Sequence, residues 1–125
     1  MLNYSDLDEE LLMQWFPELE ERIFTESELS INLPHCLYAD VLNPVVKDYL
    51  RYDNTGDPIM LNRLFDFFEY LASEGDPETK NLLQVSLLEA LWEEPGIYKR
   101  ACDLMGPNTR LINDNIRGYM REPVK

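Results

Sequence analysis

The sequence predicts an all-α protein, and three observations indicate this class. Apolar residues recur at intervals of three and four along most of the 125-residue chain, which is the spacing of one helix face. Most of the eight prolines stand where a helix would begin, and proline is tolerated there because its missing N–H would have no helical acceptor. No stretch of useful length alternates apolar and polar residues as a half-buried strand would. We therefore expect five to seven short helices joined by tight turns.

The first predicted helical segment falls within residues 7–23 and carries one apolar stripe. Residues four apart lie above one another on a helix, so the stripe would face the core. Pro17 stands inside this segment and should bend or split it, because an interior proline removes one hydrogen bond of the helix. The stripe consists of Leu7, Leu11, Trp15, Leu19 and Ile23.

The second segment, residues 38–50, has similar spacing. Asn43-Pro44 divides it, and we expect an interruption there, since a proline disfavours helical geometry in the residue before it. The apolar positions are Tyr38, Val41, Leu42, Val45, Tyr49 and Leu50.

Residues 58–73 and 77–92 are predicted to form an antiparallel helix hairpin. Each arm begins with an Asp-Pro pair, which is typical of an N-cap followed by the first helical residue. Gly75 stands where the first arm should end. The stretch 81–92 is apolar around most of its circumference, so we place it at the centre of the domain.

Two shorter segments, 97–105 and 112–120, are separated by Gly106-Pro107 and complete the chain. Helices joined by such short turns favour a stack of two or three hairpins that resembles a HEAT or armadillo array. A compact helical bundle is the alternative. The length suits one domain, so we expect residues 1–125 to form a single α-helical domain.

The charge is strongly acidic and unevenly distributed. The chain has 24 acidic residues against 11 Lys and Arg residues, a net charge of −13 at pH 7. Nine of the acids fall in the first 30 residues, where Arg22 is the only cation. This surplus would repel the phosphates of nucleic acids and anionic lipids. It predicts a basic protein partner, because a field of one sign attracts and orients an oppositely charged surface.

The sequence does not indicate catalysis or metal binding. His35 is the only histidine, and Cys36 beside it lacks the electropositive surroundings that activate a thiol. We expect His35 to have a structural role at the start of a helix. Residues 53–57, DNTGD, lack the glycine position and closing glutamate of a calcium loop. We therefore predict no enzyme, no cofactor and no metal site.

The cysteines and the lengths of the apolar runs indicate the cellular compartment of the protein. Cys36 and Cys102 fall within apolar helical patterns, so we expect buried free thiols and no disulfide. The start of the chain has no basic stretch followed by an apolar run, and no apolar run approaches the roughly 20 residues that span a bilayer. We therefore expect a cytoplasmic protein with no membrane partner.

Three stretches resemble a family of small bacterial all-helical domains of unknown function. They are LPHCLYADVLNPVVKDYL (33–50), LFDFFEYLASEGDPETKNLLQVSLLEALW (64–92) and LMGPNTRLI (104–112). The likeness runs from about residue 30 onward. It implies a stand-alone helical domain of the kind that serves as an immunity protein against a bacterial polymorphic or contact-dependent toxin. It implies no catalytic residue.

We expect an immunity protein that neutralises a cognate toxin by stoichiometric binding. A nuclease is the expected toxin class, because its basic cleft would complement rows of carboxylates. A helical-repeat adaptor that docks another protein is the alternative. Rigid aromatic groups ringed by charge are typical of protein interfaces, so an aromatic-acid ridge should assist the N-terminal acids. The candidate contact residues are Asp8, Glu9, Glu18, Glu21, Glu28, Tyr49, Tyr52, Asp53, Phe67 and Glu69.

Overall fold

The computed structural model describes residues 1–30, 34–51 and 58–121, with all side chains in these ranges except those of 29–30, 58 and 116–121. Helices make up nearly all of these residues, so the prediction of an all-α fold is confirmed. The label η marks short 3₁₀ or π-helical segments. In chain order the elements are η1 (Tyr4–Asp6), α1 (Glu9–Trp15), η2 (Pro17–Leu19), α2 (Glu20–Ser30), α3 (Pro34–Arg51), α4 (Pro58–Glu74), α5 (Pro77–Leu82), η3 (Leu83–Leu88), η4 (Glu89–Glu93), α6 (Pro95–Leu104) and α7 (Pro107–Arg121).

Prolines begin the helices as the sequence predicts. Each of the helices α3 to α7 has a proline as its first residue. Pro17 opens η2 and separates α1 from α2, so the predicted split of the first segment is confirmed. The N-cap predicted before α5 is also confirmed, because Asp76 Oδ1 accepts a hydrogen bond from the Thr79 N–H at 2.8 Å. The corresponding cap before α4, Asp57, lies outside the described residues.

The helix α3 runs without a break through Pro44, so the interruption expected at Asn43-Pro44 is wrong. The proline has no N–H and cannot donate to the carbonyl of Asp40, one turn earlier. The core face of α3 nevertheless continues across the proline, since Val41 before it and Val46 after it are both buried. Packing of this face offsets the roughly 3 kcal/mol that an interior proline costs.

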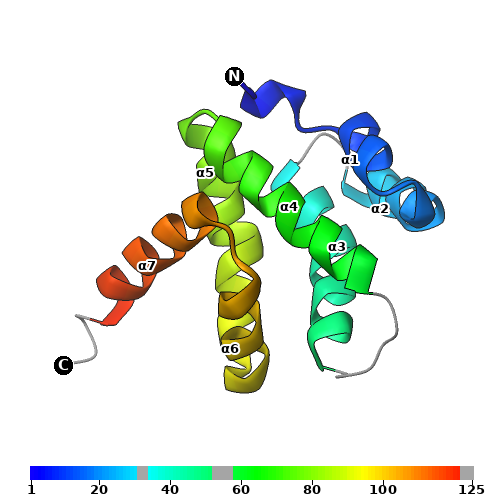
Figure 1. The fold of residues 1–125 in the computed structure, drawn as a ribbon. Coiled ribbons are helices and arrows are strands. Elements are labelled where there is room, and N and C mark those ends of the chain that lie inside the picture. Colours follow the sequence, from blue (N-terminus) through cyan, green and yellow to red (C-terminus); the bar gives the residue numbers. More distant parts are fainter. Residues whose placement is uncertain (31–33, 52–57, 122–125) are drawn as a thin grey trace.

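The helices α4 and α5 form the predicted hairpin around Gly75 and Asp76. Figure 1 shows α4 and the helix that begins with α5 spreading apart from this turn. The start of the chain lies against the turn. The Leu2 N–H donates to the Glu74 carbonyl at 2.7 Å, and the Asp76 N–H donates to the Leu2 carbonyl at 2.8 Å. Asp76 Oδ2 accepts a further bond from the Tyr4 N–H at 3.0 Å, so the turn fixes the N-terminus.

The second arm of the hairpin is not the regular α-helix that the sequence predicts. After α5 the chain continues through the π-helical segment η3 and the 3₁₀ segment η4. Ser86 in η3 is held by α3: its carbonyl accepts from Asn43 Nδ2 at 2.9 Å, and its hydroxyl lies 2.6 Å from His35 Nδ1. These bonds give the irregular turn partners outside its own helix. The predicted central position is confirmed, because η3 contacts α3, α4 and α7.

Buried apolar side chains from Leu2 to Met105 form one connected core. Among the aromatic residues predicted to lie there, Phe16, Phe65 and Phe68 are buried and two tryptophans, Trp15 and Trp92, are partly buried. The helices differ in length and direction, as Figure 1 shows. HEAT or armadillo stacking is therefore not confirmed, and the arrangement allows the alternative of a helical bundle.

We predict that Gly75→Ala destabilises the protein by about 1–3 kcal/mol. A Cβ at this position would lie 2.4 Å from the Leu71 carbonyl oxygen and 2.6 Å from Thr79 Cγ2, so the turn would have to shift. Gly96→Ala is the matched control: a Cβ there meets no atom within 4 Å, and stability should stay unchanged or rise by up to ~1 kcal/mol. Urea unfolding measures the stability of both variants. Equal unfolding midpoints for Gly75→Ala and Gly96→Ala would contradict the prediction.

Candidate functional site

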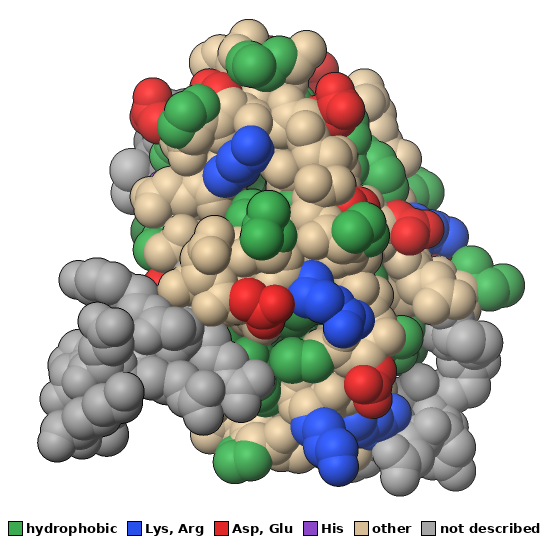
Figure 2. All heavy atoms as spheres, turned by 60° about the vertical axis from the view of Figure 1, so that its left-hand side comes forward, with side chains coloured by type: hydrophobic (Ala, Val, Ile, Leu, Met, Phe, Trp, Pro, Cys, Tyr) green, Lys and Arg blue, Asp and Glu red, His purple; other side chains and the backbone are tan. Residues whose placement is uncertain are grey.

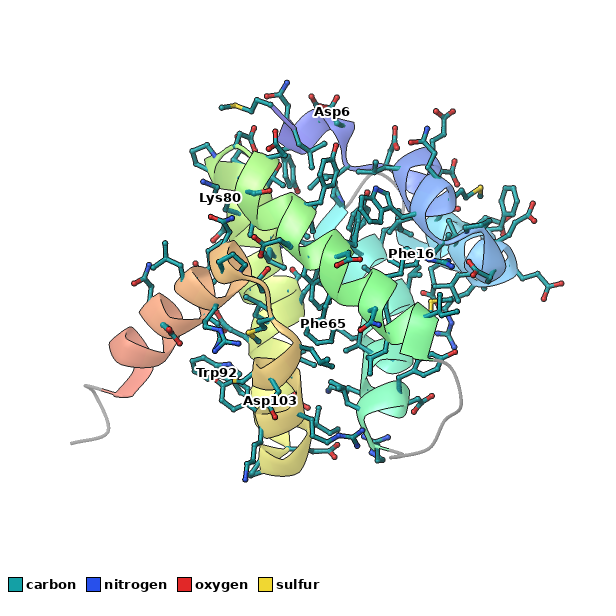
Figure 3. The ribbon with its side chains drawn as sticks, in the orientation of Figure 1. Asp6, Phe16, Phe65, Lys80, Trp92 and Asp103 are labelled. Atoms are coloured by element: carbon teal, nitrogen blue, oxygen red, sulfur yellow. The ribbon has the colours of Figure 1, made fainter. Side chains whose placement is uncertain are left out.

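The candidate interaction surface is the acidic segment, which we define as residues 6–28. It begins at Asp6, the last residue of η1, and comprises α1, η2 and most of α2; α1 and α2 lie together on one side of the molecule (Figure 1). Figure 3 shows Asp6 at the outer edge of this segment. Seven of its nine acidic residues are exposed: Asp6, Asp8, Glu10, Glu18, Glu20, Glu21 and Glu28.

An aromatic cluster of Trp15, Phe16, Tyr38 and Phe67 fastens the acidic segment to α3 and α4. The ring centroid of Phe67 lies 5.1 Å from that of Trp15 and 5.3 Å from that of Phe16. Its distance to the Tyr38 ring is 6.1 Å. Figure 3 shows Phe16 between α4 and the acidic segment. Phe67 is fully buried, so its predicted place in a partner-binding surface is wrong: its ring packs between helices.

Most carboxylates of the acidic segment are not neutralised by cations. Within the described part of the chain, Glu18 is the only one of the nine that forms an ion pair, with Arg63 of α4 at 2.6 Å. Hydrogen bonds from this guanidinium hold the pKa of the Glu18 carboxyl below its usual value. Asp8 caps α1 by accepting from the Leu11 N–H at 3.0 Å, a bond that leaves its charge in place. The segment therefore remains strongly negative.

Glu21 and Glu28 are predicted contact residues whose side chains are exposed and form no ion pair with a described residue. They lie seven residues apart on one face of α2, and the buried Ile23 marks roughly the opposite face. Glu9, in α1, is half-buried. Phe24 was not among the predicted contact residues, yet half of its surface (50%) is exposed. The sequence indicates this exposure only through position: Phe24 directly follows Ile23 and so lies beside the apolar stripe and not on it.

The described residues do not assemble the predicted aromatic-acid ridge into one surface. Tyr52 and Asp53 lie outside the described residues. Tyr49 is partly buried against the core, and Phe67 is inside it. Glu69 is engaged elsewhere in the fold, so the N-terminal acids are the part of the predicted site that stays available to a partner.

Glu69 of α4 caps the start of α7. Its Oε1 accepts from the N–H and the hydroxyl of Thr109 at 2.9 and 3.0 Å. Its Oε2 accepts from the N–H and the side-chain amide of Asn108 at 3.1 and 2.7 Å. Burial raises the pKa of this carboxyl, but the bonds together lower it by more. Gly106 permits the approach, because a Cβ there would lie 2.5 Å from Glu69 Oε1.

The side of the molecule from which α7 projects has a different charge pattern. Figure 2 shows acidic and basic side chains interspersed there, with apolar side chains between them. Among the described residues, Lys99 and Arg100 of α6 and Arg110 of α7 are basic. A basic partner would therefore find a stronger attraction at the acidic segment than on this side.

His35 and Cys36 do not combine into a reactive pair. The His35 imidazole bonds Ser86 and lies 5.8 Å from the Tyr4 ring, which ties the start of α3 to its neighbours. Cys36 and Cys102 are free thiols as predicted, but Cys36 is exposed where burial was expected. No three described His, Cys, Asp or Glu side chains are grouped so that they could hold a metal ion. In the described ranges, every helix is too short or too polar to cross a membrane.

We predict that Glu69→Gln lowers the free energy of unfolding by about 1–3 kcal/mol near neutral pH. The side-chain NH₂ of glutamine would replace one carboxylate oxygen and face the hydrogen-bond donors of Asn108 or Thr109. The folded-state pKa of Glu69 is depressed below its ordinary 4.5, so its stabilisation is present above that value. It is lost as the pH falls through the folded-state pKa, and the difference between wild type and variant should shrink there.

Urea unfolding at about pH 7 and about pH 3 tests this expectation. Glu74→Gln is the control, since that side chain is exposed on the same helix and its loss should change stability by less than ~0.5 kcal/mol. A difference between wild type and Glu69→Gln that is independent of pH would contradict the capping role.

Comparisons with known proteins place this fold in one family. The family described as a domain of unknown function (DUF7674) matches residues 9–119. The match begins at the first residue of α1 and takes in both α1 and α2, whereas the resemblance of the sequence motifs starts at about residue 30. No curated protein and no solved structure matches the chain. Because the match covers most of its length, the chain belongs to the DUF7674 family.

Proposed function

We propose that this chain is an immunity protein, a non-enzymatic inhibitor that binds a cognate bacterial toxin with defined stoichiometry and blocks it. The observation that carries the proposal is the acidic segment. Its exposed carboxylates sit on helices packed against the core, and Glu18 is the only one of these carboxylates that pairs with a described cation. The resemblance of three sequence stretches to immunity-type domains supports the same function.

The proposed partner is a protein with a basic surface. A nuclease fits this description best, since an enzyme that binds phosphates surrounds its cleft with Lys and Arg. The carboxylates of the inhibitor repel nucleic acid and anionic lipid, so neither is proposed as a partner. The inhibitor would act in the cytoplasm, where it covers the basic cleft before nucleic acid enters it.

Charge and packing contribute to such an interface in different ways. Exposed carboxylates mainly accelerate association, and they act over about 8 Å at physiological salt. Affinity requires an apolar anchor in addition, and Phe24 offers one. It is half-exposed and lies one helical turn from Glu20 and from Glu28. We therefore add Phe24 to Glu21 and Glu28 in the proposed contact.

We predict that co-expression with a toxin encoded beside this chain restores growth, and that the two proteins co-purify. An adaptor for another cellular protein would use the same surface without protecting against any toxin. Growth that stays arrested for every neighbouring toxin, although the chain is expressed and folded, would contradict the proposal and favour the adaptor.

We predict that Glu21→Lys combined with Glu28→Lys slows association with the toxin that the chain inhibits by about tenfold. The association rate should also depend less on salt. Asp103→Lys combined with Asp114→Lys is the matched control. Both of those residues are exposed, on α6 and α7, and the change in net charge is identical. Stopped-flow association at several salt concentrations gives the rates. Equal slowing by both double variants would show that overall charge, and not the acidic segment, steers the partner.

A further inference from the structure

An open groove of about 450 Å³ lies between α2 and α3. Its walls come from one side of α2, next to the face that carries Glu21 and Glu28, and from the solvent side of α3 around Pro44. One wall of the groove therefore belongs to the acidic segment. Two of the residues that line the groove are acidic and two are basic, so its attraction for a further cation depends on how far Arg22 and Lys47 are engaged elsewhere.

Hydrogen-bond acceptors converge on this groove from both helices. Glu26 of α2 and Asp40 of α3 contribute carboxylates, and neither forms an ion pair in the described part of the chain. Asn43 donates its Nδ2 to the Ser86 carbonyl at 2.9 Å, which leaves its Oδ1 as an acceptor. The main-chain carbonyl of Asp40 receives no helical hydrogen bond from Pro44, because proline has no N–H.

The two cations of the groove differ in their freedom. Lys47 is held by Glu93, with 3.1 Å between Nζ and Oε2, and 20% of its side chain is exposed. Arg22 is exposed, forms no ion pair with a described residue, and lies one turn from Glu26 on α2. Arg22 therefore competes for the carboxylates that a cation from outside would reach.

We infer that this groove receives an arginine side chain of the basic partner, an inference that rests on the proposed function. Arginine fits better than lysine because its planar guanidinium presents five donors that can reach separate acceptors, whereas lysine has three donors on one atom. The aliphatic stem of the arginine would lie over Ala39 and Pro44, which supply the apolar part of the groove. The guanidinium would bond the carboxylates of Glu26 and Asp40.

Blocked arginine (N-acetyl-arginine amide), titrated into the full chain and followed by backbone amide NMR shifts, tests the inference. Saturable shifts should be confined to residues 22–26 and 39–47, and blocked lysine should bind more weakly. Glu26→Gln combined with Asp40→Asn should weaken arginine binding about tenfold or more. Arg22→Ala should strengthen it about two- to fivefold, because a competing like charge is removed.

Glu21→Gln combined with Glu28→Gln is the matched control, with the same loss of charge on the outer face of α2. Equal weakening by this control, or the absence of saturable shifts at the groove, would overturn the inference. The proposed function is tested separately by growth rescue. A groove that binds arginine in a chain that protects against no toxin refutes the function alone, and protection by the Glu26→Gln and Asp40→Asn variant at wild-type affinity refutes the groove alone.

Discussion

The burial of Phe67, a residue of α4, against α1 and α3 is the constraint on which the acidic segment depends. Its helices are too short to persist alone, since α1 has 7 residues and α2 has 11, whereas isolated helices need about 12–15. Repulsion among their carboxylates disfavours the folded segment further. Burial of Leu12, Phe16 and Ile23 compensates, because each large apolar side chain contributes roughly 1.5–3 kcal/mol. Tyr38 adds a bond from its hydroxyl to the Asp8 carbonyl at 2.9 Å, and burial raises the pKa of that hydroxyl so that it stays a donor.

Local signals in the sequence predict most of the helices. A proline at the first helical position and an Asp before it act within one turn, and so the starts of α3 to α7 could be read directly. Pro44 shows the limit of such local rules: its penalty is offset by burial of Val41 and Val46 against residues distant in sequence. The π-helical η3 was equally out of reach, because its partners Asn43 and His35 belong to α3.

The candidate site could be predicted only where charge alone decides exposure. Glu21 and Glu28 were found because acids on a short helix remain in solvent. Phe67 was misplaced, since periodicity places a side chain on one face of α4 without showing that Trp15 of α1 covers that face. The partners of Glu69 are 39 and 40 residues away, so no local pattern indicates that its carboxylate caps α7. The groove beside Pro44 likewise depends on how α2 packs on α3.

The aromatic cluster holds the acidic segment in one structure, and amide hydrogen exchange measures this most directly. In the wild-type protein, the amides of α1 and α2 should be protected. Phe67→Leu should raise exchange in residues 9–28 well above any change in α5 and α6, because it loosens the packing under the acidic segment first. Exchange of α1 and α2 at the rate of an unfolded chain in the wild-type protein would contradict the account.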